Sequence, residues 1–73
     1  MKKGKVAWFN STKGIGFIED EKSNLVLVDI SSIQTKEKSK QLFKGQIVSF
    51  EFEEDPSGQS IATIVKPHSE KQI

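Results

Sequence analysis

Alternating apolar and polar residues are clearest in the second half of the chain, over residues 47–53 (Ile-Val-Ser-Phe-Glu-Phe-Glu). A period of two is typical of a β-strand with one buried face, because successive side chains of a strand point to opposite sides. The pattern predicts that Val48, Phe50 and Phe52 point into a hydrophobic core and that the polar residues between them point outward.

A second apolar segment, residues 13–18 (Lys-Gly-Ile-Gly-Phe-Ile), contains two glycines and also has a period of two. Glycine destabilises a helix interior, so a strand is favoured, with Ile15 and Phe17 on one face and the glycines and Ile18 on the other. Glycines inside a strand often mark a bend or a close approach of two backbones, as at the corner of a small barrel. The face with Ile15 and Phe17 would then be an open surface suited to planar ligands such as nucleic-acid bases.

Three further apolar runs predict strands at residues 5–9, 25–28 and 60–65. The residues of the first two runs that are expected in the core are Val6, Val26 and Val28. Leu25 and Leu27 would then face outward with Asp29, and strict alternation would separate Trp8 from Phe9. Polar segments rich in turn-forming residues separate the strands, at residues 10–12, 20–24 and 55–58.

The segment between the third and fourth predicted strands is long. Its first part, residues 31–34 (Ser-Ser-Ile-Gln), predicts a brief helical turn that places Ile33 in the base of the core, and residues 35–44 predict a Lys-rich loop. Three strands before this link and two after it predict an all-β fold, a five-stranded antiparallel Greek-key barrel of the OB-fold type. We expect one domain over residues 1–67 and a disordered tail over residues 68–73.

The composition excludes several kinds of site and several classes of protein. The chain has 73 residues and no cysteine, which excludes disulfides and thiolate metal sites. All eleven basic residues are lysine, so bidentate reading of base edges is disfavoured, whereas lysine contacts to phosphate remain. No apolar run approaches the roughly 18 residues of a membrane span, and no apolar stretch follows the basic N-terminus as in a secretory signal. A cytoplasmic protein is therefore expected.

The sequence offers no catalytic constellation, and we expect no enzymatic activity, metal or cofactor. Its one histidine, His68, falls in the expected tail, and no cysteine nucleophile is present. The acidic cluster within residues 51–55 lies on an outward strand face and a turn, where a charged edge is a more common role than metal binding. Gly14 and Gly16 lie inside a predicted strand rather than before a helix, so they do not form a phosphate-binding loop.

Several segments resemble a known family. Residues 4–10 (Gly-Lys-Val-Ala-Trp-Phe-Asn) and 13–18 are similar to the first two strands of the bacterial cold-shock proteins, and residues 26–34 and 45–50 resemble their third and fourth strands. The similarity extends over residues 3–66, so the chain resembles a divergent cold-shock domain. The resemblance implies a five-stranded barrel that binds single-stranded RNA and DNA by stacking bases on aromatic side chains of the first three strands.

The resemblance also implies which residues form the binding surface. Trp8 and Phe9 both contribute to it, so the first strand is expected to be bulged there. Lys5 and Lys13 are candidate phosphate contacts. The candidate nucleic-acid-binding residues are Lys5, Trp8, Phe9, Lys13, Ile15, Phe17, Leu27, Asp29 and Ile30.

The chain departs from the family at several of these positions. The family has Phe where this chain has Ile15, Leu27 and Ile30, His at Asp29, and Lys at Ala7. The aromatic residue of the family's long loop has no counterpart in residues 35–40. An aliphatic side chain offers a base a dispersion contact but no π-face, and an added carboxylate repels a phosphate backbone. These changes predict weakened nucleic-acid binding.

Two function hypotheses of different classes follow. The first is a single-stranded nucleic-acid-binding module, an RNA chaperone or a regulator of transcription or translation, with a weakened stacking surface. The second is a barrel whose aliphatic-rich surface binds a protein partner or a second copy of the chain and has largely lost nucleic-acid binding. The sequence leaves open the choice between RNA and DNA, the preferred bases and the oligomeric state.

Overall fold

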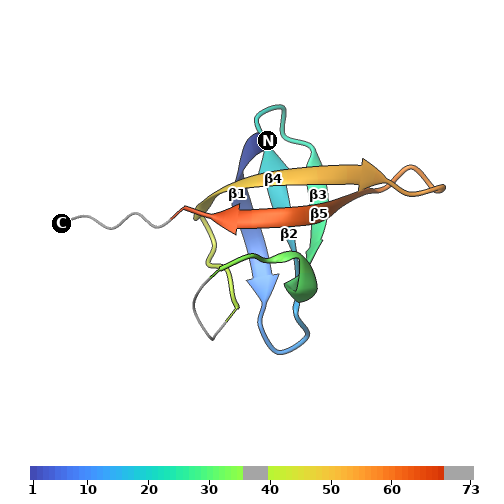
Figure 1. The fold of residues 1–73 in the computed structure, drawn as a ribbon. Helices are drawn as coiled ribbons and strands as arrows, with labels where there is room; N and C mark the ends of the chain where they lie inside the picture. The colour runs from blue at the N-terminus through green and yellow to red at the C-terminus, as the bar shows by residue number, and fades with distance from the viewer. Residues whose placement is uncertain (36–39, 69–73) are drawn as a thin grey trace.

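The computed structural model describes residues 1–35 and 40–68, which form five strands and one short 3₁₀ helix (Figure 1). In chain order the elements are β1 (Lys2–Asn10), β2 (Ile15–Asp20), β3 (Leu25–Asp29), the 3₁₀ helix η1 (Ile30–Ser32), β4 (Ile47–Glu54) and β5 (Ser60–Pro67). Within the described residues, no helix is long and apolar enough to cross a membrane.

The strands close into a barrel in the order β1-β2-β3-β5-β4. Antiparallel ladders join β1 to β2, β2 to β3, β1 to β4 and β4 to β5. The barrel closes through a parallel pairing of Leu27 on β3 with Ile61 on β5. A ring with an odd number of strands cannot reverse direction at every neighbour, so one parallel pair is unavoidable. The predicted five-stranded barrel is confirmed, with this single departure from antiparallel pairing.

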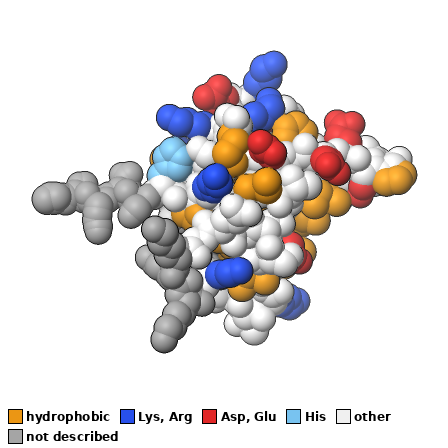
Figure 2. Space-filling model, in the orientation of Figure 1, with side chains coloured by type: hydrophobic (Ala, Val, Ile, Leu, Met, Phe, Trp, Pro, Cys, Tyr) orange, Lys and Arg blue, Asp and Glu red, His pale blue; other side chains and the backbone are white. Residues whose placement is uncertain are grey.

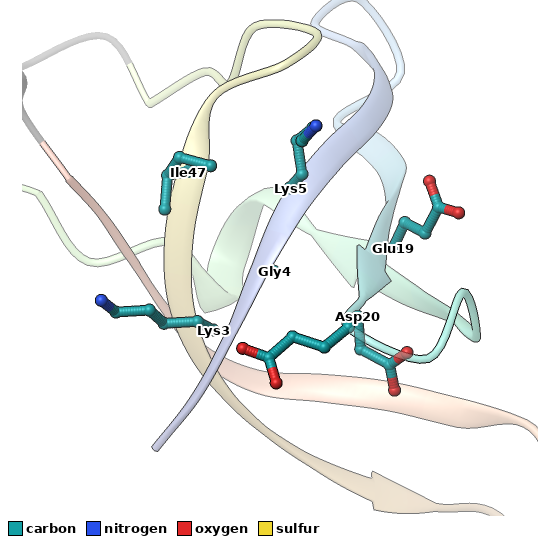
Figure 3. A pocket seen from close by; sticks show the side chains of 7 residues that line it. Lys3, Gly4, Lys5, Glu19, Asp20 and Ile47 are labelled. Atoms are coloured by element: carbon teal, nitrogen blue, oxygen red, sulfur yellow. The ribbon is translucent and has the colours of Figure 1, made fainter.

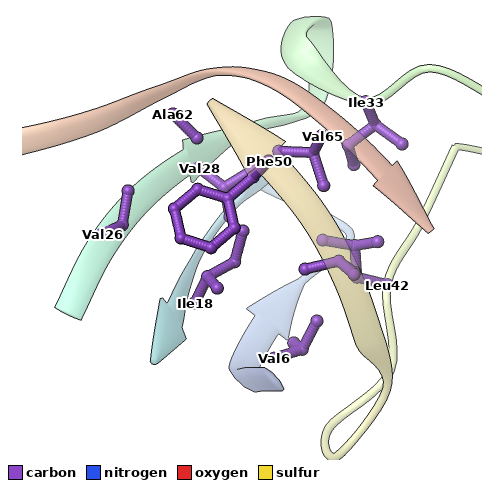
Figure 4. Packing of buried hydrophobic residues seen from close by; sticks show 10 residues of the cluster. Val6, Ile18, Val26, Val28, Ile33, Leu42, Phe50, Ala62 and Val65 are labelled. Atoms are coloured by element: carbon purple, nitrogen blue, oxygen red, sulfur yellow. The ribbon is translucent and has the colours of Figure 1, made fainter. Parts of the chain in front are cut away.

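Among the described residues, ten buried apolar side chains fill the barrel (Figure 4): Val6, Ile18, Val26, Val28, Ile33, Leu42, Val48, Phe50, Ala62 and Val65. The alternation in β4 placed Val48 and Phe50 in the core correctly, and both are completely buried. Phe52 is only partly buried, packing against the cluster with its ring centroid 6.1 Å from that of Phe50. Leu42 comes from the predicted loop, whose weak pattern did not reveal a core residue.

A β-bulge in β1 sets the direction of its aromatic residues. Val6 pairs with Ile18 and Trp8 pairs with Phe17, so the register with β2 shifts between Val6 and Trp8. The extra residue, Ala7, rotates the following side chains relative to strict alternation. The first strand is irregular as expected, but the bulge lies at Ala7 and does not bring Trp8 and Phe9 onto one face, since Trp8 is exposed and Phe9 packs against the core.

The structure differs from the sequence prediction at the starts of two strands and at the start of the tail. β1 begins at Lys2 rather than at residue 5, and β2 begins at Ile15 rather than at residue 13. His68, which the sequence assigned to the tail, donates its backbone N–H to the Ile47 carbonyl at 3.0 Å. The alternating pattern could not show this contact, because it depends on a neighbouring strand. Residues 36–39 of the predicted loop and residues 69–73 of the predicted tail lie outside the described residues.

Aspartate side chains accept hydrogen bonds that order the turn between β2 and β3 and the turn between β4 and β5. The Asn24 backbone N–H donates to Asp20 Oδ1 at 2.8 Å, and the Ser57 hydroxyl and the Gln59 N–H donate to Asp55 Oδ1 at 2.6 and 3.0 Å. The Asn24 bond lowers the pKa of Asp20, and the Ser57 hydroxyl followed by the Gln59 amide lowers the pKa of Asp55, because these donors favour the charged carboxylate.

Candidate nucleic-acid interface

Three rows of side chains cross the outer face of β1, β2 and β3. The central row consists of Trp8, Phe17 and Leu27, which the strand registers place opposite one another. The ring centroids of Trp8 and Phe17 lie 5.7 Å apart with the ring planes tilted by 58°, a favourable geometry for aromatic neighbours. Trp8 is 45% exposed, whereas Phe17 and Leu27 are half-buried. The central row therefore has one solvent-exposed aromatic ring, that of Trp8, next to two half-buried apolar side chains.

Charged residues lie in the rows on both sides of the central row. One flanking row consists of Lys5, Glu19 and Leu25, and the other of Asn10, Ile15 and Asp29. Leu25 is 54% exposed and adds apolar surface that the sequence placed outward but did not assign to binding. Each flanking row contains a carboxylate, so a phosphate backbone approaching the central row meets charges of both signs.

Gly16 lets β1 and β2 approach closely behind the central row. A Cβ at this position would overlap the Trp8 carbonyl oxygen and lie 2.8 Å from Phe9 Cα. Only a residue without a side chain fits where the bulged strand presses on its neighbour. The close backbone approach predicted from the glycine pair is confirmed at this position.

The turn between β1 and β2 is ordered by Asn10 and contains the exposed Lys13. Asn10 Oδ1 accepts hydrogen bonds from the backbone N–H groups of Thr12 and Lys13, each at 3.0 Å. Gly14 follows with a φ of +70°, and its carbonyl accepts the Ile30 N–H at 2.9 Å. This hydrogen bond joins the turn to the end of β3. Lys13 is exposed in the turn, where it can contact a phosphate at this end of the face.

Asp29 is the N-cap of η1 as well as a charge on the face. Its Oδ1 accepts the Ser31 backbone N–H at 2.9 Å. This hydrogen bond lowers the pKa of the Asp29 carboxyl, because it favours the charged form. The sequence indicated only the charge of Asp29. An aspartate two residues before a serine, just after an apolar strand, is a turn-capping pattern that could have indicated the second role.

Phe9 and Ile30 are less accessible than the resemblance led us to expect. Both are partly buried and pack against the core. Phe9 pairs with the buried Gly16, and Ile30 Cγ2 lies only 3.0 Å from where a Cβ on Gly14 would be. Because of the bulge, Trp8 and not Phe9 is the residue of this adjacent pair that faces outward, and Trp8 is exposed beside Phe17 whereas Phe9 is half-covered.

An exposed aromatic residue that the sequence analysis did not consider lies near β1. Phe43 is 62% exposed and starts a turn in which its carbonyl accepts the Gln46 N–H at 2.9 Å. The Gly45 N–H donates to the Val6 carbonyl at 2.8 Å, so this turn lies alongside β1. Its only signal in the sequence was an aromatic residue beside a lysine, which is too general to assign a role.

A hollow of about 410 Å³ borders the flanking row that contains Lys5 and Glu19 (Figure 3). It is lined by Lys3, Gly4, Lys5, Glu19, Asp20, Glu21 and Ile47. Because both lysines and carboxylates line the hollow, it favours neither an anionic nor a cationic ligand. In the part of the chain that the structure describes, no group of three or more acidic or histidine side chains could hold a metal ion.

Comparison with known proteins places this barrel in a family. The profile of the 'Cold-shock' DNA-binding domain matches residues 2–67, which include all five strands. The chain belongs to the cold-shock domain family. Cold-shock domains bind nucleic acids, so membership supports the first function hypothesis and does not favour a protein-binding barrel as the alternative.

Bacterial relatives of this cold-shock domain match it over most of their length. It is 48% identical over 66 residues to Cold shock protein CspA of Staphylococcus saprophyticus, covering 90% of this chain and 98% of the relative. It is 51% identical over 63 residues to Cold shock-like protein CspE of Bacillus anthracis, covering 86% and 92%. Identity to Cold shock protein CspA of Staphylococcus aureus is 47% over 66 residues, covering 90% and 98%.

Proposed function

We propose that this cold-shock domain binds single-stranded RNA or DNA on the outer face of β1, β2 and β3. The observation that supports the proposal most strongly is the central row, in which the exposed Trp8 ring contacts Phe17 beside Leu27. Unpaired bases stack on such rings with little dependence on sequence. Binding of this kind suits an RNA chaperone or a regulator of transcription or translation.

The stacking surface is smaller than one made entirely of aromatic residues. Replacing a stacking aromatic residue by alanine costs about 1–3 kcal/mol per base. If Ile15 and Leu27 each retain half of this through dispersion contacts, the two positions together forfeit about 1–3 kcal/mol. The affinity is then lower by roughly one to two decades than that of a domain with aromatic residues at both positions.

Lysines supply the electrostatic part of the binding. Lys5 in a flanking row and Lys13 in the adjoining turn are both exposed, as are Lys40 and Lys44 beyond β3. With about two to four phosphate contacts, the logarithm of the affinity is expected to fall with the logarithm of the salt concentration at a slope of roughly −1.4 to −2.8. A slope near zero would contradict a phosphate-containing ligand.

The proposal describes a binding module and assigns it no catalytic step, metal or cofactor. Stacking and phosphate contacts account for the residues of the face, and its two carboxylates lie in separate flanking rows. The cytoplasmic location expected from the sequence stays a prediction, as do a protein partner and self-association.

Titration of the protein with a mixed set of single-stranded oligonucleotides tests the proposal through Trp8 fluorescence. Trp8 is the only tryptophan and the chain has no tyrosine, so the signal comes from the central row itself. We expect quenching that saturates, and its loss in a Phe17→Ala variant that remains folded. An unchanged spectrum at millimolar oligonucleotide would contradict the proposal.

A further inference from the structure

Positively charged side chains lie around Ser49 on the outer face of β1, β4 and β5. The strand registers pair Ser49 with Lys3 on β1 and with Lys66 on β5. Directly paired residues of antiparallel strands point to the same face, and both lysines are exposed. Two lysines from different strands therefore flank one serine.

His68 adds a third group to this position. Its Nε2 lies 2.6 Å from the Ser49 hydroxyl oxygen, and its backbone N–H is bound to the Ile47 carbonyl. A serine hydroxyl can donate or accept, so the contact forms with either tautomer of the imidazole. Figure 2 shows the histidine with lysine side chains beside it. We call Lys3, Lys66 and His68 the cationic cluster.

The acidic groups nearest to Lys3 are those at the end of β2 and just after it, Glu19, Asp20 and Glu21, which line one hollow together with Lys3. Figure 3 shows the Lys3 side chain extending across β4, away from Glu19 and Asp20. The next outward position on β4 after Ser49 is Glu51, which pairs with Ile64 rather than with a lysine. On the other side of Ser49, Lys5 pairs with Ile47. The charge that faces Ser49 from both neighbouring strands is therefore positive.

We propose that the cationic cluster binds phosphate groups of a nucleic-acid strand whose bases occupy the central row. This inference rests on the proposed function. Lysine ammonium groups bind phosphate as point charges, each with three donors, and an imidazole N–H is a further donor for a phosphate oxygen.

A nucleic-acid strand is favoured as the ligand because the cationic cluster and the central row share β1. Lys3 and Trp8 are on the same strand, roughly 16 Å apart at about 3.3 Å per residue. One barrel of this type covers about 4–16 nucleotides. A short oligonucleotide therefore occupies the central row alone, whereas a longer one reaches past Lys5 to Ser49.

The test compares oligothymidylates of about 6 and about 16 nucleotides, near the two ends of this range. In the double variant Lys3→Gln, Lys66→Gln, we expect the affinity for the short strand to stay within twofold of the natural protein. The affinity for the long strand should fall about tenfold at about 50 mM salt, and its salt slope should become shallower by about 1.4, or 0.7 for each lost contact. Lys22→Gln, in the turn between β2 and β3, is the matched control and should leave both affinities unchanged.

His68→Gln tests the third member of the cationic cluster. This variant removes the imidazole that contacts Ser49, and it should bind the long strand more weakly than the natural protein does. The short strand should show no such difference.

Two results would overturn the inference. Equal losses for both strands in the double variant would show that the lysines act on the central row or on the fold, and unchanged affinities for both would show that this face does not contact the strand. Failure of the proposed function looks different, because the short strand would then leave the Trp8 fluorescence of the natural protein unchanged.

Discussion

Asp29 has two effects that oppose each other in a nucleic-acid-binding protein. Its carboxylate caps η1 through the Ser31 N–H, which orders the end of β3. The same carboxylate places a negative charge in the flanking row beside Ile15. Asparagine caps a helix about as well as aspartate but has no charge, so one substitution separates the two effects.

We expect Asp29→Asn to strengthen binding of a short oligonucleotide by about threefold at low salt, since a unit charge some 6–7 Å from a phosphate contributes about 0.6 kcal/mol in water. The gain should shrink as salt screens the charge. Asp29→Ala is the control for the cap, and its free energy of unfolding should fall by about 1 kcal/mol. Fluorescence titration at two salt concentrations checks the prediction, and an equal gain at both would show that charge is not the cause.

The aliphatic residues of the face have a second testable consequence. Ile15 and Leu27 lie at outward positions of β2 and β3 and are half-buried, so larger rings have room to spread over the surface. We expect the double change Ile15→Phe, Leu27→Phe to raise oligonucleotide affinity by about tenfold, within the 1–3 kcal/mol that the two aliphatic residues forfeit. Ile30, packed against Gly14, is left unchanged. Unaltered affinity in a folded variant would mean that bases do not reach these positions.

At the scale of the elements, the bulge in β1 and Gly16 on β2 act together. The bulge turns Trp8 outward, and Gly16 makes room for the backbone that carries it. Gly16→Ala should therefore destabilise the barrel and displace Trp8, lowering both the free energy of unfolding and the affinity for oligonucleotides.

Gly45→Ala is the matched control for this change. Gly45 has a φ of +87°, but a Cβ added there would meet no atom within 4 Å, so only the backbone cost of about 1–2 kcal/mol applies. Denaturant unfolding measures the loss in free energy of unfolding for both variants. A smaller loss for Gly16→Ala than for Gly45→Ala would contradict the close approach of β1 and β2.

The aspartate-capped turns make stability depend on pH. Hydrogen bonds lower the pKa values of Asp20, Asp29 and Asp55 in the folded protein. A carboxyl group whose pKa is lowered by folding stabilises the protein above its unfolded pKa of about 3.9, and this stabilisation is lost as the pH falls through the folded pKa. We expect the free energy of unfolding to decrease below about pH 5, and to decrease less in Asp55→Asn. Urea unfolding from neutral to acidic pH measures this, and a stability that rises on acidification would refute it.

At the scale of the whole molecule, the sequence predicted the features that have a local signature and missed those that only the packing of distant segments produces. Alternation identified Val48 and Phe50 as core residues, and the spaced glycines indicated a close backbone approach. The position of Leu42 depends on the core cluster and that of His68 on β4, and neither contact has a local pattern in the sequence. The burial of Phe9 follows from the bulge, whose effect on each side chain only the three-dimensional register reveals.

The resemblance to the family indicated the binding face, but the geometry of the face came from the structure. Nine candidate residues were expected to act together, and the registers place six of them in the central and flanking rows: Lys5, Trp8, Ile15, Phe17, Leu27 and Asp29. Lys13 lies in the adjoining turn, and Phe9 and Ile30 are half-covered. The cationic cluster around Ser49 was not evident in the sequence, since Lys3, Ser49 and Lys66 are far apart along the chain.

The most direct test of binding on this face is to map a short single-stranded oligonucleotide onto the backbone amides by nuclear magnetic resonance. The largest shift changes should fall on the central row (Trp8, Phe17 and Leu27) and on its two flanking rows, with little change at Glu51 and Glu53 on β4. Shift changes centred on β4 and β5, or none at saturating oligonucleotide, would contradict binding on the face of β1, β2 and β3.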